Sequence, residues 1–265
     1  MSIPVPFGQY VPADSPVHRL DPRVKIGLTA AYTVMLFSVE GFAGLGLAAV
    51  VVAVAIVLSH VPLRLVARGV RMISFLLLFT VLVHALQWQP ATVTLVRIGP
   101  IGIDGQGLVE GLFFAARIVL LVLGTSLITL TTSPVALTDG LERLMKPLER
   151  LKFPAGDVAM MLTIALRFIP TTAEEAEKII VAQTARGASF SEGGPLKRAR
   201  AYIPVLVPLF VGLFRRAEDL AVAMESRCYR GGTGRTRLME SRIRSTDWAT
   251  LACGLAMFVA IGVAL

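Results

Sequence analysis

Two charged, amphipathic stretches decide the fold of this chain. Residues 155–187 read AGDVAMMLTIALRFIPTTAEEAEKIIVAQTARG, and residues 209–230 read LFVGLFRRAEDLAVAMESRCYR. In both stretches apolar residues recur at the three- and four-residue spacing of one helix face, with charged residues on the opposite face. Each stretch carries an arginine close to its end, Arg186 in the first and Arg227 in the second. The sequence therefore predicts two long amphipathic helices, called the arms below.

The rest of the chain has the composition of a membrane protein. Hydrophobic residues make up 55% of it and charged residues 17%, with a mean hydropathy of +0.71, whereas soluble domains carry about 25% charged residues. The apolar residues fall in long blocks, as in membrane-spanning helices. A net charge of +8 could suggest nucleic-acid binding, but the basic residues collect in a few segments between the blocks, which the positive-inside rule explains better.

We predict five membrane spans. Residues 26–58 are too long for a single crossing at 1.5 Å per residue, so we expect a helical hairpin that turns outside the membrane at Glu40 and Gly41. The third, fourth and fifth spans are expected at residues 72–88, 111–130 and 248–265. The remaining segments are predicted as a non-helical surface stretch at 1–20, a basic loop at 60–71 and an outer loop, with a small β-hairpin, at 89–109.

The basic residues also predict the orientation. Three precede residue 26, three lie within 60–71 and eighteen lie within 139–244. Basic residues favour the cytoplasmic side. We therefore place the N-terminus and the arms on the cytoplasmic side of the cell membrane and the C-terminus on its outer side. Trp88 and Trp248 fall at expected interfaces. The predicted fold is an all-α integral membrane protein with transmembrane helices in 1–132, a cytoplasmic coupling-helix module in 133–245 and a last transmembrane helix in 246–265.

Local signals refine the cytoplasmic module. Thr131 to Pro134 should end the fourth span, and residues 139–151 show the apolar stripe of another amphipathic helix. Pro170 is expected to kink the first arm and to begin a fresh helix rich in glutamate. Gly187 suits the residue that follows a helix end, and Gly231–Gly232 should end the second arm.

Five stretches match a known family in the expected order. They are Gly8–Gln9–Tyr10–x–Pro12, Ser15–x–x–His18–Arg19–Leu20–Asp21–Pro22–Arg23–x–Lys25, Ala165–Leu166–Arg167–Phe168–Ile169–Pro170, Ala182–Gln183–x–Ala185–Arg186–Gly187 and Ala217–Glu218–x–Leu220–Ala221–x–Ala223–Met224–Glu225–x–Arg227–x–Tyr229. On these motifs the chain resembles the transmembrane T-component of energy-coupling-factor (ECF) transporters, the EcfT family, which import vitamins and trace metals and are related to ABC transporters. The opening stretch is more similar to T-components of shared modules than to cobalt- or biotin-dedicated ones.

The resemblance implies a coupling role without catalysis. The arms would be coupling helices that cross on the inner face and dock at their tips on two ABC-type ATPase subunits, which bind the ATP. A separate membrane-embedded S-component would bind the substrate, so that this chain needs no cofactor of its own. The docking contact would lie in two short motifs, Ala185, Arg186 and Gly187, and Ser226, Arg227 and Cys228. Cys228 departs from the family pattern, which has Gly or Ser after the arginine.

Several residues also allow plainer interpretations. Arg186 and Arg227 could each simply complement a helix dipole, worth about 0.3–1 kcal/mol, but two arms with the same ending favour docking, for which arginine offers a permanently charged, bidentate fork. Arg117 is expected to pair with Glu110 or to reach the outer surface rather than to line a substrate path. The structural anchors predicted within the matched motifs are Asp21, Pro22, Arg23, Arg167 and Pro170.

Other functions find less support in the residues. A self-contained permease normally places charged residues near the middle of the membrane, and the predicted spans are almost uncharged. Basic residues such as Lys197, Arg198 and Arg200 fit contact with anionic lipid headgroups. No metal-ligand spacing, paired carboxylates or nucleophile with a base stands out, so neither a metal site nor an enzyme is predicted.

Overall fold

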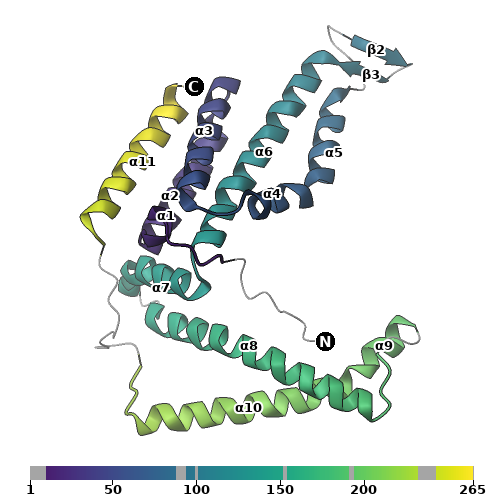
Figure 1. Ribbon diagram of the computed structural model, residues 1–265, viewed down its shortest axis with the longest axis vertical. Coiled ribbons are helices and arrows are strands. Elements are labelled where there is room, and N and C mark those ends of the chain that lie inside the picture. Colours follow the sequence, from purple (N-terminus) through teal and green to yellow (C-terminus); the bar gives the residue numbers. More distant parts are fainter. Residues whose placement is uncertain are drawn as a thin grey trace. The chain divides into compact units, whose positions relative to one another are not determined.

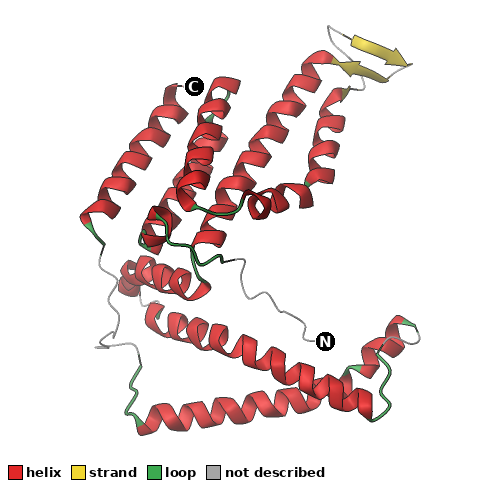
Figure 2. Cartoon of the chain, viewed as in Figure 1, coloured by secondary structure: helices red, strands yellow, loops and turns green. Residues whose placement is uncertain are grey.

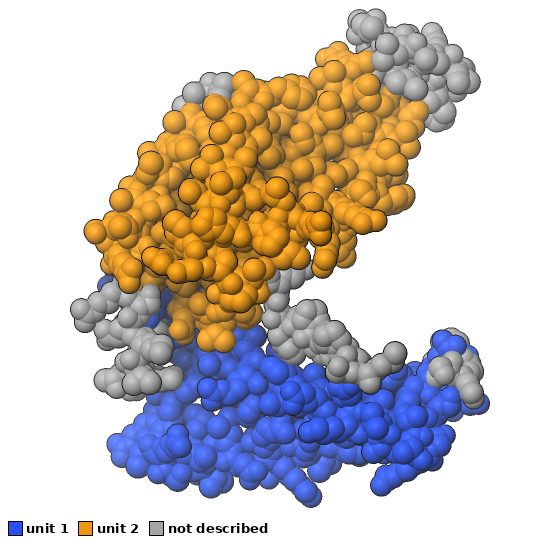
Figure 3. Space-filling model, in the orientation of Figure 1, with its two compact units in different colours: residues 1–7, 141–239 blue, residues 8–140, 240–265 orange. Residues whose placement is uncertain are grey.

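The computed structural model describes residues 10–87, 94–98, 101–151, 154–190, 194–231 and 243–264. Helices make up most of this part of the chain, together with one small sheet (Figures 1 and 2). The chain divides into two compact units (Figure 3). We call residues 8–140 with 240–265 the membrane unit, and residues 1–7 with 141–239 the arm unit.

The membrane unit is a bundle of mostly apolar helices. In chain order they are α1 (Pro16–Arg19), α2 (Pro22–Ser38), α3 (Phe42–Ser59), α4 (Leu63–Met72), α5 (Ser74–Ala85), α6 (Gly105–Thr131) and α11 (Ser245–Ala264). Three of them, α3, α6 and residues 245–262 of α11, are long and apolar enough to cross a membrane, and α4 with α5 would form a fourth span bent by 50°. The chain is thus an all-α membrane protein, and the number of five spans stays a prediction.

The predicted ends of the early helices agree with the structure at two places. The hairpin at residues 26–58 is present, because α2 ends at Ser38 and α3 begins at Phe42. The end of the fourth apolar helix at Thr131 is also confirmed, and Pro134 begins α7 (Pro134–Met145). The first twenty residues were expected to be non-helical, but Pro16 begins the one-turn helix α1, with Ser15 as its N-cap.

The prediction of a basic loop at 60–71 is wrong, because α4 occupies most of that segment. Arg64, Arg68 and Arg71 are spaced by four and three residues and so share one helix face, which makes α4 amphipathic rather than irregular. The third apolar helix, α5, already ends at Ala85, and Trp88 lies outside the described residues. The fourth begins at Gly105, earlier than expected.

A three-stranded antiparallel sheet joins α5 to α6. Its strands are β1 (Leu86–Gln87), β2 (Thr94–Ile98) and β3 (Ile101–Asp104), and β3 lies in the middle. Strands β2 and β3 form the hairpin predicted within 89–109, and β3 leads directly into α6.

The core of the membrane unit lies where α2, α3 and α6 meet. Leu36 is fully buried and Leu130 is 1% exposed. The ring of Tyr32 fills the space over Gly124, where a β-carbon would lie 2.3 Å from the ring, and its hydroxyl donates to the carbonyl of Leu120 at 2.7 Å. Small residues that admit a large neighbour in this way are common at helix interfaces in membranes.

The arm unit contains the two long helices. Its elements are the end of α7, the 3₁₀ helix η1 (Lys146–Leu151), α8 (Ala155–Ala185), α9 (Pro195–Ala201) and α10 (Ile203–Ser226). The amphipathic helix predicted at 139–151 is present as the second half of α7 followed by η1. The second arm begins earlier than expected, at Ile203, and ends at Ser226 rather than at Gly231–Gly232; Gly232 lies outside the described residues.

No fresh helix begins at Pro170. Helix α8 continues through it from Ala155 to Ala185, although proline removes one backbone hydrogen bond. The residues on both sides of the proline, Phe168 and Thr171, contact Arg216 of α10, so packing against the second arm supports the helix at this point.

Candidate functional site

The first arm ends in a Schellman motif centred on Arg186. Arg186 is the C-cap of α8, and Gly187 follows with a φ of 90°. The N–H of Ala188 donates to the carbonyl of Gln183 at 3.0 Å, and the N–H of Gly187 donates to that of Thr184 at 2.9 Å. These two bonds define the motif, and the arginine lies exposed at this helix end.

The second arm ends in the same motif. Arg227 is the C-cap of α10, and Cys228 follows with a φ of 57°. The N–H of Tyr229 donates to the carbonyl of Met224 at 3.0 Å, and the N–H of Cys228 donates to that of Glu225 at 2.8 Å. Cys228, the residue at which the sequence departs from the expected pattern, therefore occupies the left-handed position that Gly187 fills in the first arm.

All six residues predicted to dock are exposed. This holds for Ala185, Arg186 and Gly187, and for Ser226, Arg227 and Cys228. Within the described part of the chain, neither guanidinium makes a hydrogen bond or an ion pair. The two motifs do not come together into one site, because α8 and α10 run in opposite directions and their C-terminal ends lie far apart in the arm unit (Figure 1). They are two separate, similar tips.

The two arms are joined between the tips by polar contacts. Arg216 of α10 forms an ion pair with Glu175 of α8 at 2.8 Å, and it donates to the hydroxyl of Thr171 at 3.2 Å. The amide of Gln183 donates to the carbonyl of Pro204 at 3.3 Å. The sequence interpretation missed this pairing, because nothing in the residue pattern says which charges of one arm face the other.

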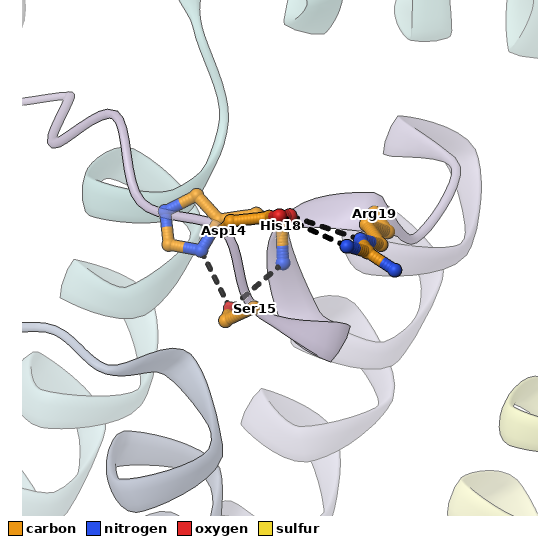
Figure 4. Close-up of polar contacts among 4 residues, drawn as sticks. All are labelled: Asp14, Ser15, His18 and Arg19. Atoms are coloured by element: carbon orange, nitrogen blue, oxygen red, sulfur yellow. Dashed lines mark hydrogen bonds and ion pairs between the residues drawn. The ribbon is translucent and has the colours of Figure 1, made fainter.

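The matched N-terminal motif forms a local network of hydrogen bonds (Figure 4). The N–H of His18 donates to Ser15 Oγ at 3.2 Å, and its Nδ1 lies 2.7 Å from the same oxygen. His18 Nε2 lies 3.0 Å from the carbonyl of Val11, which can only accept. Arg19 donates to both carboxylate oxygens of Asp14 at 2.9 Å, and these bonds hold the pKa of Asp14 below its ordinary value.

The end of this motif fixes the start of α2. Asp21 is its N-cap and accepts from the N–H of Arg23 at 2.9 Å, while Pro22 is the first helical residue. The buried amine of Lys25 donates to the carbonyl of Thr131 at 2.9 Å and thereby ties α2 to the end of α6. Asp21 and Pro22 thus cap and start α2. Whether these residues also anchor a partner stays a prediction.

The remaining singled-out residues have simpler surroundings. Arg167 is exposed, and Pro170 is half-buried within α8. Arg117 does not pair with Glu110: it donates to the carbonyl of Val39, the C-cap of α2, and lies 4.8 Å from the centre of the Phe113 ring. A helix end presents free carbonyls that attract a cation, so the end of α2 takes the place that was expected for Glu110.

One hollow of about 600 Å³ lies within the membrane unit, between α2, α3, α6 and α11. Its lining is mostly apolar, with Val51, Leu127 and Met257 among the wall residues. The amine of Lys25 at its edge is already bonded to Thr131. In the described residues, no three His, Cys, Asp or Glu side chains are grouped closely enough to hold a metal ion.

Comparison with known proteins places the chain in a family. Residues 13–238 match the family described as cobalt transport protein, CbiQ. A protein of Thermosediminibacter oceani named energy-coupling factor transporter transmembrane protein EcfT is 47% identical over 97% of this chain and 94% of that protein. Proteins of the same name from Thermanaerovibrio acidaminovorans and Heliobacterium modesticaldum are 52% and 45% identical, over 93% and 97% of this chain and 91% and 96% of those proteins.

Matches that cover nearly the whole chain at this identity agree with the apolar helices and the two amphipathic arms. The chain belongs to the family of energy-coupling factor transporter transmembrane proteins and is a transmembrane component of an ECF transporter.

Proposed function

We propose that this chain is the coupling subunit of an ECF importer for vitamins or other micronutrients. In this proposal α8 and α10 transmit ATP-driven motion from two ATPase subunits to a separate substrate-binding membrane subunit. The observation that carries the proposal is the pair of matching tips, each with an exposed arginine at the C-cap of a long helix. The chain itself performs no reaction, and ATP is bound by its partners.

The chemistry of the tips supports docking on a protein groove. A free guanidinium offers five N–H donors in a planar fork, which can bind a carboxylate through two parallel hydrogen bonds. Because the Schellman motif fixes the backbone around each arginine, docking orders little besides the side chain itself. A low entropic cost of ordering strengthens binding.

The exposed side chains of α10 support a second partner. Ile203, Val207, Phe210 and Phe214 follow the spacing of one helix face, and they are 52%, 57%, 56% and 69% exposed. A contiguous apolar face of this kind typically marks a protein or membrane contact. We assign this apolar face of α10 to contact with the substrate-binding membrane subunit, which would then pack against the arm that the ATPases move.

Charge reversal at both tips tests the docking. We expect Arg186→Glu with Arg227→Glu to abolish co-purification of the ATPase subunits and substrate uptake, while the protein still accumulates in the membrane. The matched control is Lys178→Glu with Arg215→Glu, which makes the same charge change at exposed positions of the same two helices. Unchanged complex yield and uptake in the tip variant would refute the docking.

A further inference from the structure

The last part of each arm is similar in sequence to that of the other, and we call the two similar segments the copies. Residues 175–187 read EAEKIIVAQTARG, and residues 216–228 read RAEDLAVAMESRC. Without any gap, five of the thirteen positions are identical, including the two tip arginines. Both copies are helical and end in the same motif, so the likeness in sequence is also a likeness in structure.

The first residues of the two copies are Glu175 and Arg216, and they bind each other. Arg216 Nη2 lies 2.8 Å from Glu175 Oε2, and both side chains are about one-third exposed, at 34% and 30%. Equivalent positions of two like segments pair with each other only where an approximate two-fold axis relates the segments. The ion pair therefore lies close to the centre of a nearly symmetric pair of arms.

The contacts around this ion pair fix one antiparallel register. Gln183 meets Pro204, Glu175 meets Gly212, and Thr171 meets Arg216, so every step back along α8 is matched by an equal step forward along α10. Gly212 allows the close approach, because a β-carbon there would lie 2.8 Å from Glu175 Oε1.

A single guanidinium spans two turns of α8. Arg216 contacts Glu175 and Thr171, and its central carbon lies 5.8 Å from the centre of the Phe168 ring. These three residues share one face of α8. A group held at three points along a helix resists both sliding and rotation of the second arm, which the single point charge of a lysine would not do.

The position of the ion pair makes the tips sensitive to it. Arg186 follows Glu175 by eleven positions, and Arg227 follows Arg216 by eleven positions, which is about 16 Å of helix on each side. A rotation of about 10° at the ion pair would therefore move each tip by about 3 Å. Hydrogen bonds tolerate only a few tenths of an ångström, so such a shift would break a bidentate arginine contact.

We propose that Glu175 and Arg216 are positioning residues: their ion pair sets the register and crossing of α8 on α10, and thereby the spacing of the two arginine tips. The proposal rests on the docking function argued above. Neither residue touches an ATPase in this scheme. They act through Arg186 and Arg227, by holding them at the separation that two grooves on a pair of ATPases require.

A distance measurement on the full-length chain tests whether the ion pair of Glu175 with Arg216, called the clamp below, holds the two arms in place. Spin labels at Val181→Cys and Val222→Cys, which are equivalent exposed positions before each tip, are attached in nanodiscs. The background is Cys228→Ser, a residue that the family pattern has at this position, with Cys253→Ala, and its co-purification of ATPases is compared with that of the unaltered chain. We expect one narrow distance distribution, which Glu175→Gln or Arg216→Gln broadens and shifts. The matched controls, Glu174→Gln and Arg215→Gln, remove neighbouring exposed charges and should leave it narrow.

Exchanging the two charges gives the sharper test. Glu175→Arg with Arg216→Glu keeps opposite charges at the two equivalent positions, although the contacts of Arg216 with Thr171 and Phe168 are lost. We expect each single variant to lose co-purification of ATPases, and the double variant to have a narrower distribution than either and to regain part of that co-purification. An unchanged distribution in the single variants, or a double variant as broad as either, would overturn the clamp. Altered distances with normal ATPase binding and uptake would overturn its role in positioning the tips.

The two proposals fail in different ways. If the tips do not dock, Arg186→Glu with Arg227→Glu keeps its partners, while the distances between labels still report whether the ion pair holds the arms. Arg216→Lys provides a mild variant that keeps the charge. It should bind ATPases less well than the wild type, with a distribution between those of wild type and Arg216→Gln.

Discussion

Gly187 and Cys228 occupy the same position in two copies of one helix-ending motif, and both hold a positive φ, of 90° and 57°. Glycine adopts this conformation freely, whereas a residue with a β-carbon is strained there by about 1–2 kcal/mol. The second tip therefore stores a strain that the first tip lacks. No side-chain contact compensates in the described part of the chain, where Cys228 is an exposed free thiol.

Replacing that cysteine by glycine should stabilise the second tip. We expect Cys228→Gly to gain about 0.5–1 kcal/mol, because relief of strain exceeds the entropic cost of an added glycine. Gly187→Ala should lose about 1–2 kcal/mol at the first tip for the converse reason. Hydrogen exchange of the amides at 187–188 and 228–229 reads each tip separately. Cys228→Ala serves as control, and equal protection in the alanine and glycine variants would contradict the prediction.

The contact of Tyr32 with Gly124 predicts a position that tolerates no side chain. Gly124→Ala places a methyl group 2.3 Å from the ring, and overpacking of this kind costs about 1–3 kcal/mol. The melting temperature in detergent should fall accordingly. Gly46→Ala is the control, since nothing lies within 4 Å of a β-carbon there. Adding Tyr32→Leu to Gly124→Ala should recover part of the loss, because the two changes act on one contact; strict additivity would speak against that contact.

The partner of Arg117 separates a packing role from a transport role. Arg117→Met leaves the carbonyl of Val39 without its donor and should cost about 1–3 kcal/mol in stability. Glu110→Gln should change little, since Glu110 is exposed. Both variants are compared by thermal unfolding and by uptake in the assembled transporter. A large loss of uptake by Arg117→Met at unchanged stability would contradict the packing role.

Much of the fold follows from local patterns in the sequence. Apolar blocks and turn residues located the α2–α3 hairpin, the end of α6 and the tip of α8, because each depends on residues close together in the chain. Two predictions failed: a loop at 60–71, where the helical spacing of the arginines was overlooked, and a new helix at Pro170, where contacts with the other arm keep the first helix continuous. The three arginines of α4 lie on one helix face. Helix α8 continues through Pro170, next to which Phe168 and Thr171 contact Arg216.

The candidate site was only partly predictable. Arg186 with its following glycine is a local signal, and the sequence alone indicated it. Cys228 at a left-handed position is not, because cysteine carries no preference for that conformation and only the repeated hydrogen bonds reveal it. The ion pair of Glu175 with Arg216 joins residues distant in sequence, so it depends on a helix packing that no local pattern encodes.

The ends of the two arms share one helix-ending motif but carry different side chains around it. When the two tips are aligned, Ala185 corresponds to Ser226, and Gly187 corresponds to Cys228. At these two aligned positions the second tip presents a hydroxyl and a thiol, whereas the first presents a methyl group and no side chain, so the two tips are chemically distinct surfaces.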